Sequence, residues 1–176
     1  MPDTATLSTC RLVRAGAPFK GKQGLMYSPA ISAESVASHA IHMQLLSIPP
    51  GGRAKAHKHA SHETAIYVLS GVAGMWYGEH LEHHYTIKAG DFLYIPADMP
   101  HLPYNPSTTE NCTSIITRTD PNEQESVVLL PHLEAIHPPS EPYPSYPTAT
   151  PTSHRQLTTD PNRSHITSNK QQATSN

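Results

Sequence analysis

Three histidines and one glutamate occur at a spacing that could bind a metal ion. The stretch from Gly51 to Glu63 contains His57 and His59. Residues two apart on a β-strand point to the same side, so a regular strand would present His57, His59 and Glu63 on one face. A second polar segment ends in His101. Three imidazole nitrogens and one carboxylate oxygen suit iron(II), manganese(II), nickel(II), copper(II) or zinc(II).

Such a ligand set favours catalysis over a purely structural role. Four protein ligands leave one or two positions open on a five- or six-coordinate ion, and metal catalysis requires an open position. Glu63 would act both as a ligand and as a proton acceptor during the reaction. We expect one divalent transition metal, with iron(II) favoured.

Short apolar segments separated by turn residues surround these candidate ligands. Aromatic residues on them, such as Phe92 and Tyr94, are expected in the core. No amphipathic helix of useful length interrupts the series, so the pattern predicts an all-β barrel or sandwich. The predicted strands are His39–Ile48, Thr64–Ser70, Val72–Tyr77, Leu81–Lys88, Asp91–Ile95, Cys112–Thr119 and Ser126–Leu130.

The two polar segments resemble the two sequence motifs of the cupin superfamily. The resemblance implies a double-stranded β-helix, or jelly-roll barrel, with His57, His59, Glu63 and His101 as metal ligands near one mouth. It also implies a homodimer, because cupins commonly exchange strands at the N-terminal arm. The matching positions are Gly51, His57, His59, Glu63 and Gly71 in the first motif, and Gly90, Pro96, His101 and Asn105 in the second.

Two positions depart from the cupin pattern. Asp98 stands where the second motif has glycine, in a turn where aspartate tolerates a positive φ. Seven residues separate Glu63 from Gly71, where the pattern has six. Counting back from Gly71 puts Thr64 in the glutamate position, and His62 is a further candidate. We expect Glu63 to be the ligand, with a β-bulge just after it absorbing the extra residue.

Composition divides the chain into three parts. Residues 1–37 carry few long apolar runs and are expected to form an N-terminal arm that packs loosely on the barrel, at most with one strand. Residues 38–137 are the predicted cupin barrel. Seven of the 18 prolines lie in residues 138–176. That segment has too few large apolar residues to offset its chain entropy, so we expect a disordered tail.

The overall composition excludes several classes of protein. With 12 Lys+Arg against 14 Asp+Glu and no basic cluster, nothing indicates nucleic-acid binding. No apolar run approaches the roughly 18 residues needed to span a membrane. The N-terminus lacks a secretion signal and the two cysteines do not form a disulfide framework, so we expect a cytoplasmic protein.

These features together predict a metal-dependent enzyme that acts on a small organic molecule. The leading hypothesis is a dioxygenase, an oxidoreductase in which the ion binds the substrate and activates dioxygen. The alternatives are a metal-dependent isomerase, lyase or decarboxylase, and a non-catalytic cupin that binds a small molecule.

Overall fold

The computed structural model describes residues 9–123 and 126–138. The predicted tail, residues 138–176, lies outside these ranges except for its first residue. The elements are β1 (Phe19–Lys20), β2 (Met26–Ile31), α1 (Ala33–Val36), β3 (His42–Ile48), β4 (His57–His59), β5 (Thr64–Ser70), β6 (Val72–Tyr77), β7 (His83–Lys88), β8 (Phe92–Ile95), β9 (His101–Tyr104), β10 (Cys112–Arg118), β11 (Val127–Leu129) and the short 3₁₀ helix η1 (Pro131–Leu133).

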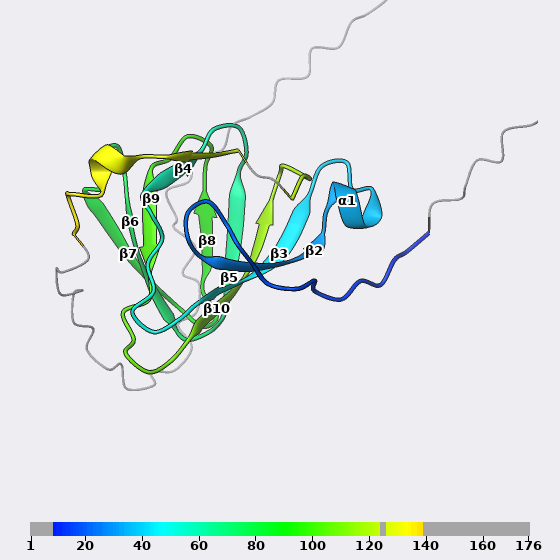
Figure 1. Ribbon diagram of the computed structural model, residues 1–176, viewed down its shortest axis with the longest axis horizontal. Helices are drawn as coiled ribbons and strands as arrows, with labels where there is room; N and C mark the ends of the chain where they lie inside the picture. Colours follow the sequence, from blue (N-terminus) through cyan, green and yellow to red (C-terminus); the bar gives the residue numbers. More distant parts are fainter. Residues whose placement is uncertain (1–8, 124–125, 139–176) are drawn as a thin grey trace, which may run out of the picture. The chain divides into compact units, whose positions relative to one another are not determined.

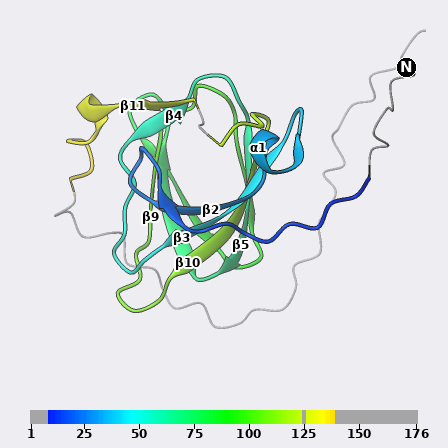
Figure 2. The ribbon, with the colours of Figure 1, turned by 45° about the vertical axis from the view of Figure 1, so that its right-hand side comes forward.

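The strands form two antiparallel sheets that curve around a common interior (Figure 1; Figure 2). One sheet has the order β1-β2-β3-β10-β5-β8, and the other has the order β11-β4-β9-β6-β7. The predicted all-β cupin barrel is confirmed. In the described residues, no helix is long and apolar enough to cross a membrane.

Part of the predicted N-terminal arm belongs to the larger sheet. Strand β2 pairs with β3 from Met26↔Ser47 onward. Leu25 and Tyr27 are both buried in the core, at 3% and 4% exposure. The second half of this arm is therefore a structural strand of the barrel.

The main core lies between the sheets and follows from alternation along the strands. In β3 and β10 every second side chain is buried, as expected when one face of a strand packs inward. Buried side chains from both sheets meet in one cluster: Leu25, Tyr27, Leu46, Ile48, Ala54, Val68, Ala73, Met75, Ile87, Ile95, Cys112 and Ile116.

A second, smaller core covers the outer face of the five-stranded sheet. Leu102 and Tyr104 of β9 are fully buried there, and Leu133 of η1 packs against them. Both faces of β9 are therefore buried, which holds this strand rigidly in place. The outer face of the six-stranded sheet differs, because Phe92 is 82% exposed and Tyr94 is 59% exposed. The expectation that these two aromatic residues are in the core is wrong.

Candidate metal centre

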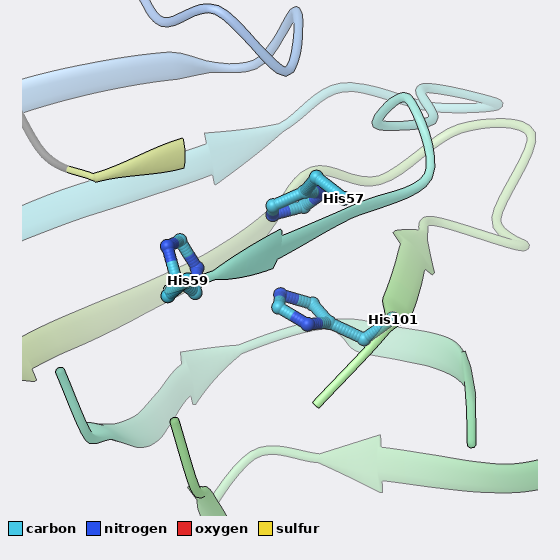
Figure 3. A group of neighbouring side chains, drawn as sticks. All are labelled: His57, His59 and His101. Atoms are coloured by element: carbon cyan, nitrogen blue, oxygen red, sulfur yellow. The ribbon is translucent and has the colours of Figure 1, made fainter. Parts of the chain in front are cut away.

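Two neighbouring strands of the five-stranded sheet carry the three predicted histidines. In β4 the side chains of His57 and His59 are buried and that of Lys58 between them is not, as expected for a strand with one inward face. His101 begins β9 and lies directly opposite His57 in the pairing of the two strands. Figure 3 shows the three rings around a common space.

The three rings are close enough to share one ion. One ring nitrogen from each of His57, His59 and His101 lies within 4.8 Å of the other two. The ring centroids of His57 and His101 are 4.2 Å apart, and those of His59 and His101 are 5.1 Å apart. A metal–nitrogen bond is about 2.1 Å long, so two nitrogens on one ion are up to about 4 Å apart. Small ring rotations therefore suffice for all three to coordinate one ion.

Backbone carbonyl groups fix two of the rings. Nδ1 of His57 donates a hydrogen bond to the carbonyl oxygen of Lys55 at 2.7 Å. Nδ1 of His101 donates in the same way to the carbonyl oxygen of Met99 at 2.8 Å. A carbonyl can only accept, so Nδ1 carries the proton and Nε2 keeps its lone pair. Second-shell bonds of this kind are typical of metal-binding histidines.

The surroundings of the three rings keep them neutral. Burial and the neighbouring His101 lower the pKa of His59 from 6.5 to about 2. Burial lowers the pKa of His101 to about 4 and that of His57 well below its usual value. A neutral imidazole is the form that binds a metal, so the donor set fits a divalent transition metal.

The turn before β9 holds β4 in position beside it. The backbone N–H of Asp98 donates to the carbonyl oxygen of His59 at 2.8 Å, and the Asp98 carboxylate lies 2.9 Å from Nζ of Lys58. Asp98 has φ of 62°, so the expectation that aspartate adopts the left-handed conformation here is confirmed. This turn aligns His59 with His101.

The structure does not bring Glu63 to the three histidines. The Glu63 side chain is exposed, and its Oε1 accepts a hydrogen bond of 2.8 Å from the hydroxyl group of Tyr94. Strand β4 ends at His59 and β5 begins at Thr64, so residues 60–63 form a loop. Strand parity, on which the expectation for Glu63 rested, does not extend across that loop.

Thr64 takes the inward position that the family pattern gives to glutamate. It is 4% exposed, and its Oγ1 has no hydrogen-bond partner among the described residues. Strand β5 pairs with β8 in regular register from Thr64↔Ile95 to Tyr67↔Phe92. The predicted bulge just after Glu63, around residues 64–66, is therefore wrong; the register of β5 against β10 shifts only later, between Val68 and Ser70.

His62, the other candidate, is buried beside the cluster and lies outside it. Its ring centroid is 4.5 Å from that of His59, and its Nδ1 is 3.1 Å from Oγ of Ser126. Burial lowers its pKa, and the nearby Arg118 lowers it further. No nitrogen of His62 belongs to the group within 4.8 Å.

The three histidines open onto a cavity of about 50 Å³ inside the barrel, which is partly open to solvent. Thr64, Gln44 and Ser114 also line it, and apolar side chains from both sheets form most of the remaining wall. Gln44 and Ser114 were not predicted from the sequence to be site residues. Both lie at inward-facing positions of predicted strands. Strand alternation identifies such positions, but it does not show whether the side chain there lines a cavity or fills the core.

Comparison with known proteins agrees with this architecture. Residues 44–116, which contain both histidine segments, match the family model for the cupin domain. No curated protein sequence matches the chain.

Several solved structures of oxalate decarboxylases are similar in fold. One is the Lactobacillus farciminis enzyme in complex with formate, with 21% identity, a TM-score of 0.56, and coverage of 69% of this chain and 36% of that one. Another is the Bacillus subtilis enzyme at pH 4.6, with 25% identity, a TM-score of 0.55, and coverage of 69% and 31%.

A third structure, reported in a study of the Mn(II) centres of the Bacillus subtilis enzyme, shows 23% identity, a TM-score of 0.55, and coverage of 69% and 32%. This chain thus spans about a third of the length of these decarboxylases. The family model, the two-sheet architecture and the histidine positions agree. Residues 44–116 of this chain therefore form a cupin domain.

Proposed function

We propose that His57, His59 and His101 hold one divalent transition metal, and that the barrel is an enzyme using this ion as a Lewis acid on a small organic molecule. The class of reaction would be that of a decarboxylase, isomerase or lyase. The observation that carries the proposal is the convergence of three neutral imidazoles on a cavity inside the barrel.

The charge of the donor set supports this chemistry. All three donors are neutral, so an ion bound there would keep its full double positive charge. A carboxylate ligand would remove part of that charge, and the only nearby carboxylate considered from sequence, Glu63, is on the exposed surface. A bound divalent ion polarises a carbonyl or carboxylate oxygen and stabilises negative charge that develops on it.

The remaining residues would position the substrate and exclude water. The carbonyl groups of Lys55 and Met99 hold two rings in one tautomer. The apolar cavity wall lowers the local dielectric constant, which strengthens every electrostatic interaction inside. The Thr64 hydroxyl group is available to hydrogen-bond a substrate oxygen.

Manganese(II) has the more specific support as the bound ion. One of the similar structures comes from a study of the Mn(II) centres of Bacillus subtilis oxalate decarboxylase. Iron(II), the metal favoured from the sequence, is supported only by the nitrogen donors, which also suit manganese. The dioxygenase hypothesis has no comparable support, because the similar structures are decarboxylases.

Metal analysis and a paired activity assay test the proposal. The purified full-length chain should contain one equivalent of manganese or another divalent metal. A panel of small carboxylic and hydroxy acids should then be screened for carbon dioxide release and dioxygen consumption in the same vessel. Product formation without dioxygen consumption is expected. Stoichiometric dioxygen consumption would overturn the Lewis-acid proposal in favour of a dioxygenase.

A further inference from the structure

The lining of the cavity defines the class of substrate. We propose that it binds a molecule with a single acidic oxygen group at the histidine end and an uncharged, largely apolar body, and that it rejects dicarboxylates. This inference deepens the proposed function and rests on its metal for the binding of the acidic group.

The body of the ligand would meet hydrocarbon on both sides. The six-stranded sheet contributes Leu46, Val68 and Ile116 to the cavity wall, and the five-stranded sheet contributes Met75 and Ile87. These five side chains are each no more than 8% exposed. Filling such a space with an apolar group removes hydrocarbon from water on both partners, which favours binding.

Polar groups in the cavity wall are few and uncharged. Besides the histidines, the polar side chains among the described lining residues are those of Gln23, Tyr27, Gln44, Thr64 and Ser114. The hydroxyl group of Thr64 has no hydrogen-bond partner among the described residues. A buried hydroxyl without a partner is costly, so a ligand oxygen that accepts from it or donates to it would relieve that cost. Thr64 begins the strand that follows the His59 loop, which suits it to the acidic end of the ligand.

Among the described residues, no lysine, arginine, aspartate or glutamate lines the cavity. Arg53, next to β4, binds the Glu134 carboxylate at 3.1 Å, and Lys55 is exposed. Arg118 is buried on the inner face of β10, but its Nη2 donates to the carbonyl oxygens of Asn122 and Glu123. None of the described residues that line the cavity carries a positive charge, so the ion would supply it at the histidine end, and a second carboxylate at the apolar end of the ligand would be buried without a partner.

Two acids of equal chain length test this inference. Pentanoate and glutarate both have five carbons and differ in having one carboxylate or two. Binding should be measured by calorimetry on the full-length, manganese-loaded protein at pH 7.5. Pentanoate is expected to bind at least about tenfold more tightly than glutarate. Equal binding, tighter binding of glutarate, or no binding of either acid to fully loaded protein would overturn the inference.

Metal content separates this result from the proposed function. If the protein retains no metal, the proposed function fails, and the same pair is then measured on the metal-free chain. A preference for pentanoate there would still support the apolar cavity, and no preference would overturn it.

A matched pair of variants tests the role of Thr64. Thr64→Val keeps the shape and removes the hydroxyl group, and it should weaken pentanoate binding about three- to tenfold with unchanged metal content. Thr117→Val makes the same change on the outward face of β10 and should leave binding unchanged. Equal effects of the two variants would overturn the assignment of Thr64 to the ligand.

Discussion

His57 and His101 lie directly opposite each other on β4 and β9, and each ring donates from Nδ1 to the carbonyl group of the residue two positions before it. The same local geometry thus occurs twice, once at the start of each strand. It turns both Nε2 atoms toward the cavity before any ion binds. The site is preorganised by the backbone, so a metal would need little rearrangement of these two rings.

Removing any one of the three histidines should release the metal. His57→Ala, His59→Ala and His101→Ala each delete one of three protein ligands, and we expect metal occupancy to fall at least about tenfold. The barrel should still fold, because the apolar core between the sheets is unchanged. Elemental analysis and circular dichroism of each purified variant measure the two effects.

The control for these variants is His83→Ala, since the His83 side chain is 60% exposed and lies on β7 away from the cluster. It should keep its metal. Full occupancy in His101→Ala would contradict the three-histidine centre.

Replacing Glu63 should leave the metal in place. The Glu63 carboxylate is exposed and bonded to Tyr94, so Glu63→Gln should not change metal content or chelator resistance. The hydrogen bond to the Glu63 carboxylate, and to a smaller extent its charge, raises the pKa of Tyr94, so this pKa should fall in a spectrophotometric titration of the variant. Loss of metal together with an unchanged tyrosine titration would show that the 60–63 loop turns inward when metal binds.

Introducing a carboxylate at position 64 should have the opposite effect on the metal. Thr64→Glu places an acidic group on the cavity-facing position, where it could become a fourth ligand. We expect metal retention against a chelator to increase about tenfold. The metal-free variant should be less stable than the unmodified chain, because it buries a carboxylate without a cation. A decrease in metal retention would mean that residue 64 does not reach the ion.

The metal-free protein should become less stable as the pH falls below about 6.5. The pKa of His59 in the folded chain is about 2, and those of His42 and His101 are about 4, against an ordinary value of 6.5. Between those values the unfolded chain binds more protons than the folded one, so protonation favours unfolding. These histidines leave the free energy of unfolding unchanged above pH 6.5 and lower it progressively as the pH falls from 6.5 toward 4.

Urea unfolding of the metal-free chain at pH 7.5, 6.0 and 5.0 measures this dependence. The unfolding midpoint should decrease at each step. A midpoint that stays constant from pH 7.5 to 5.0 would show that the folded chain protonates these histidines as easily as the unfolded one.

Gly74 should tolerate no side chain. A Cβ atom there would lie 2.2 Å from Cζ of Tyr104, whose hydroxyl oxygen is 2.9 Å from Nε2 of His84. Gly74→Ala should therefore cost about 1 to 3 kcal/mol through displacement of the Tyr104 ring. Gly16→Ala is the matched control, since its nearest contact would be an ordinary 3.4 Å. Equal melting temperatures for the two variants would contradict this close packing.

The sequence allowed prediction of most of the strands, because apolar runs bounded by turn residues are a local signal, but it did not predict β2 (Met26–Ile31) or β9 (His101–Tyr104) as strands. The parity of His57 and His59 holds inside β4, and His101, the histidine of the second motif, lies close to both. Glu63 was predicted by the same parity, but a loop separates it from the strand. Parity has no meaning across residues in a loop, and sequence alone did not indicate where β4 ends.

The exposure of aromatic residues could not be predicted for a related reason. The side chain of Tyr94 points to the opposite face of β8 from those of its two neighbours, as a strand predicts, but this alternation does not show which face of the sheet other segments cover. Whether a face is covered depends on segments distant in the sequence. Leu133 of η1 packs over β9, whereas no described segment covers the outer face of β8. The interior cavity likewise depends on the volumes of side chains from both sheets.

The loop between β4 and β5 shows how the charge of a metal site can change by insertion rather than by substitution. With four residues between β4 and β5, the glutamate that ends the loop is on the surface and the following threonine faces inward at the start of a regularly paired segment. A single codon inserted or deleted in a surface loop would thus exchange a carboxylate for a hydroxyl group beside the ion. Such a change leaves the barrel intact, so loop length offers a short evolutionary route between cupins with different ligand sets.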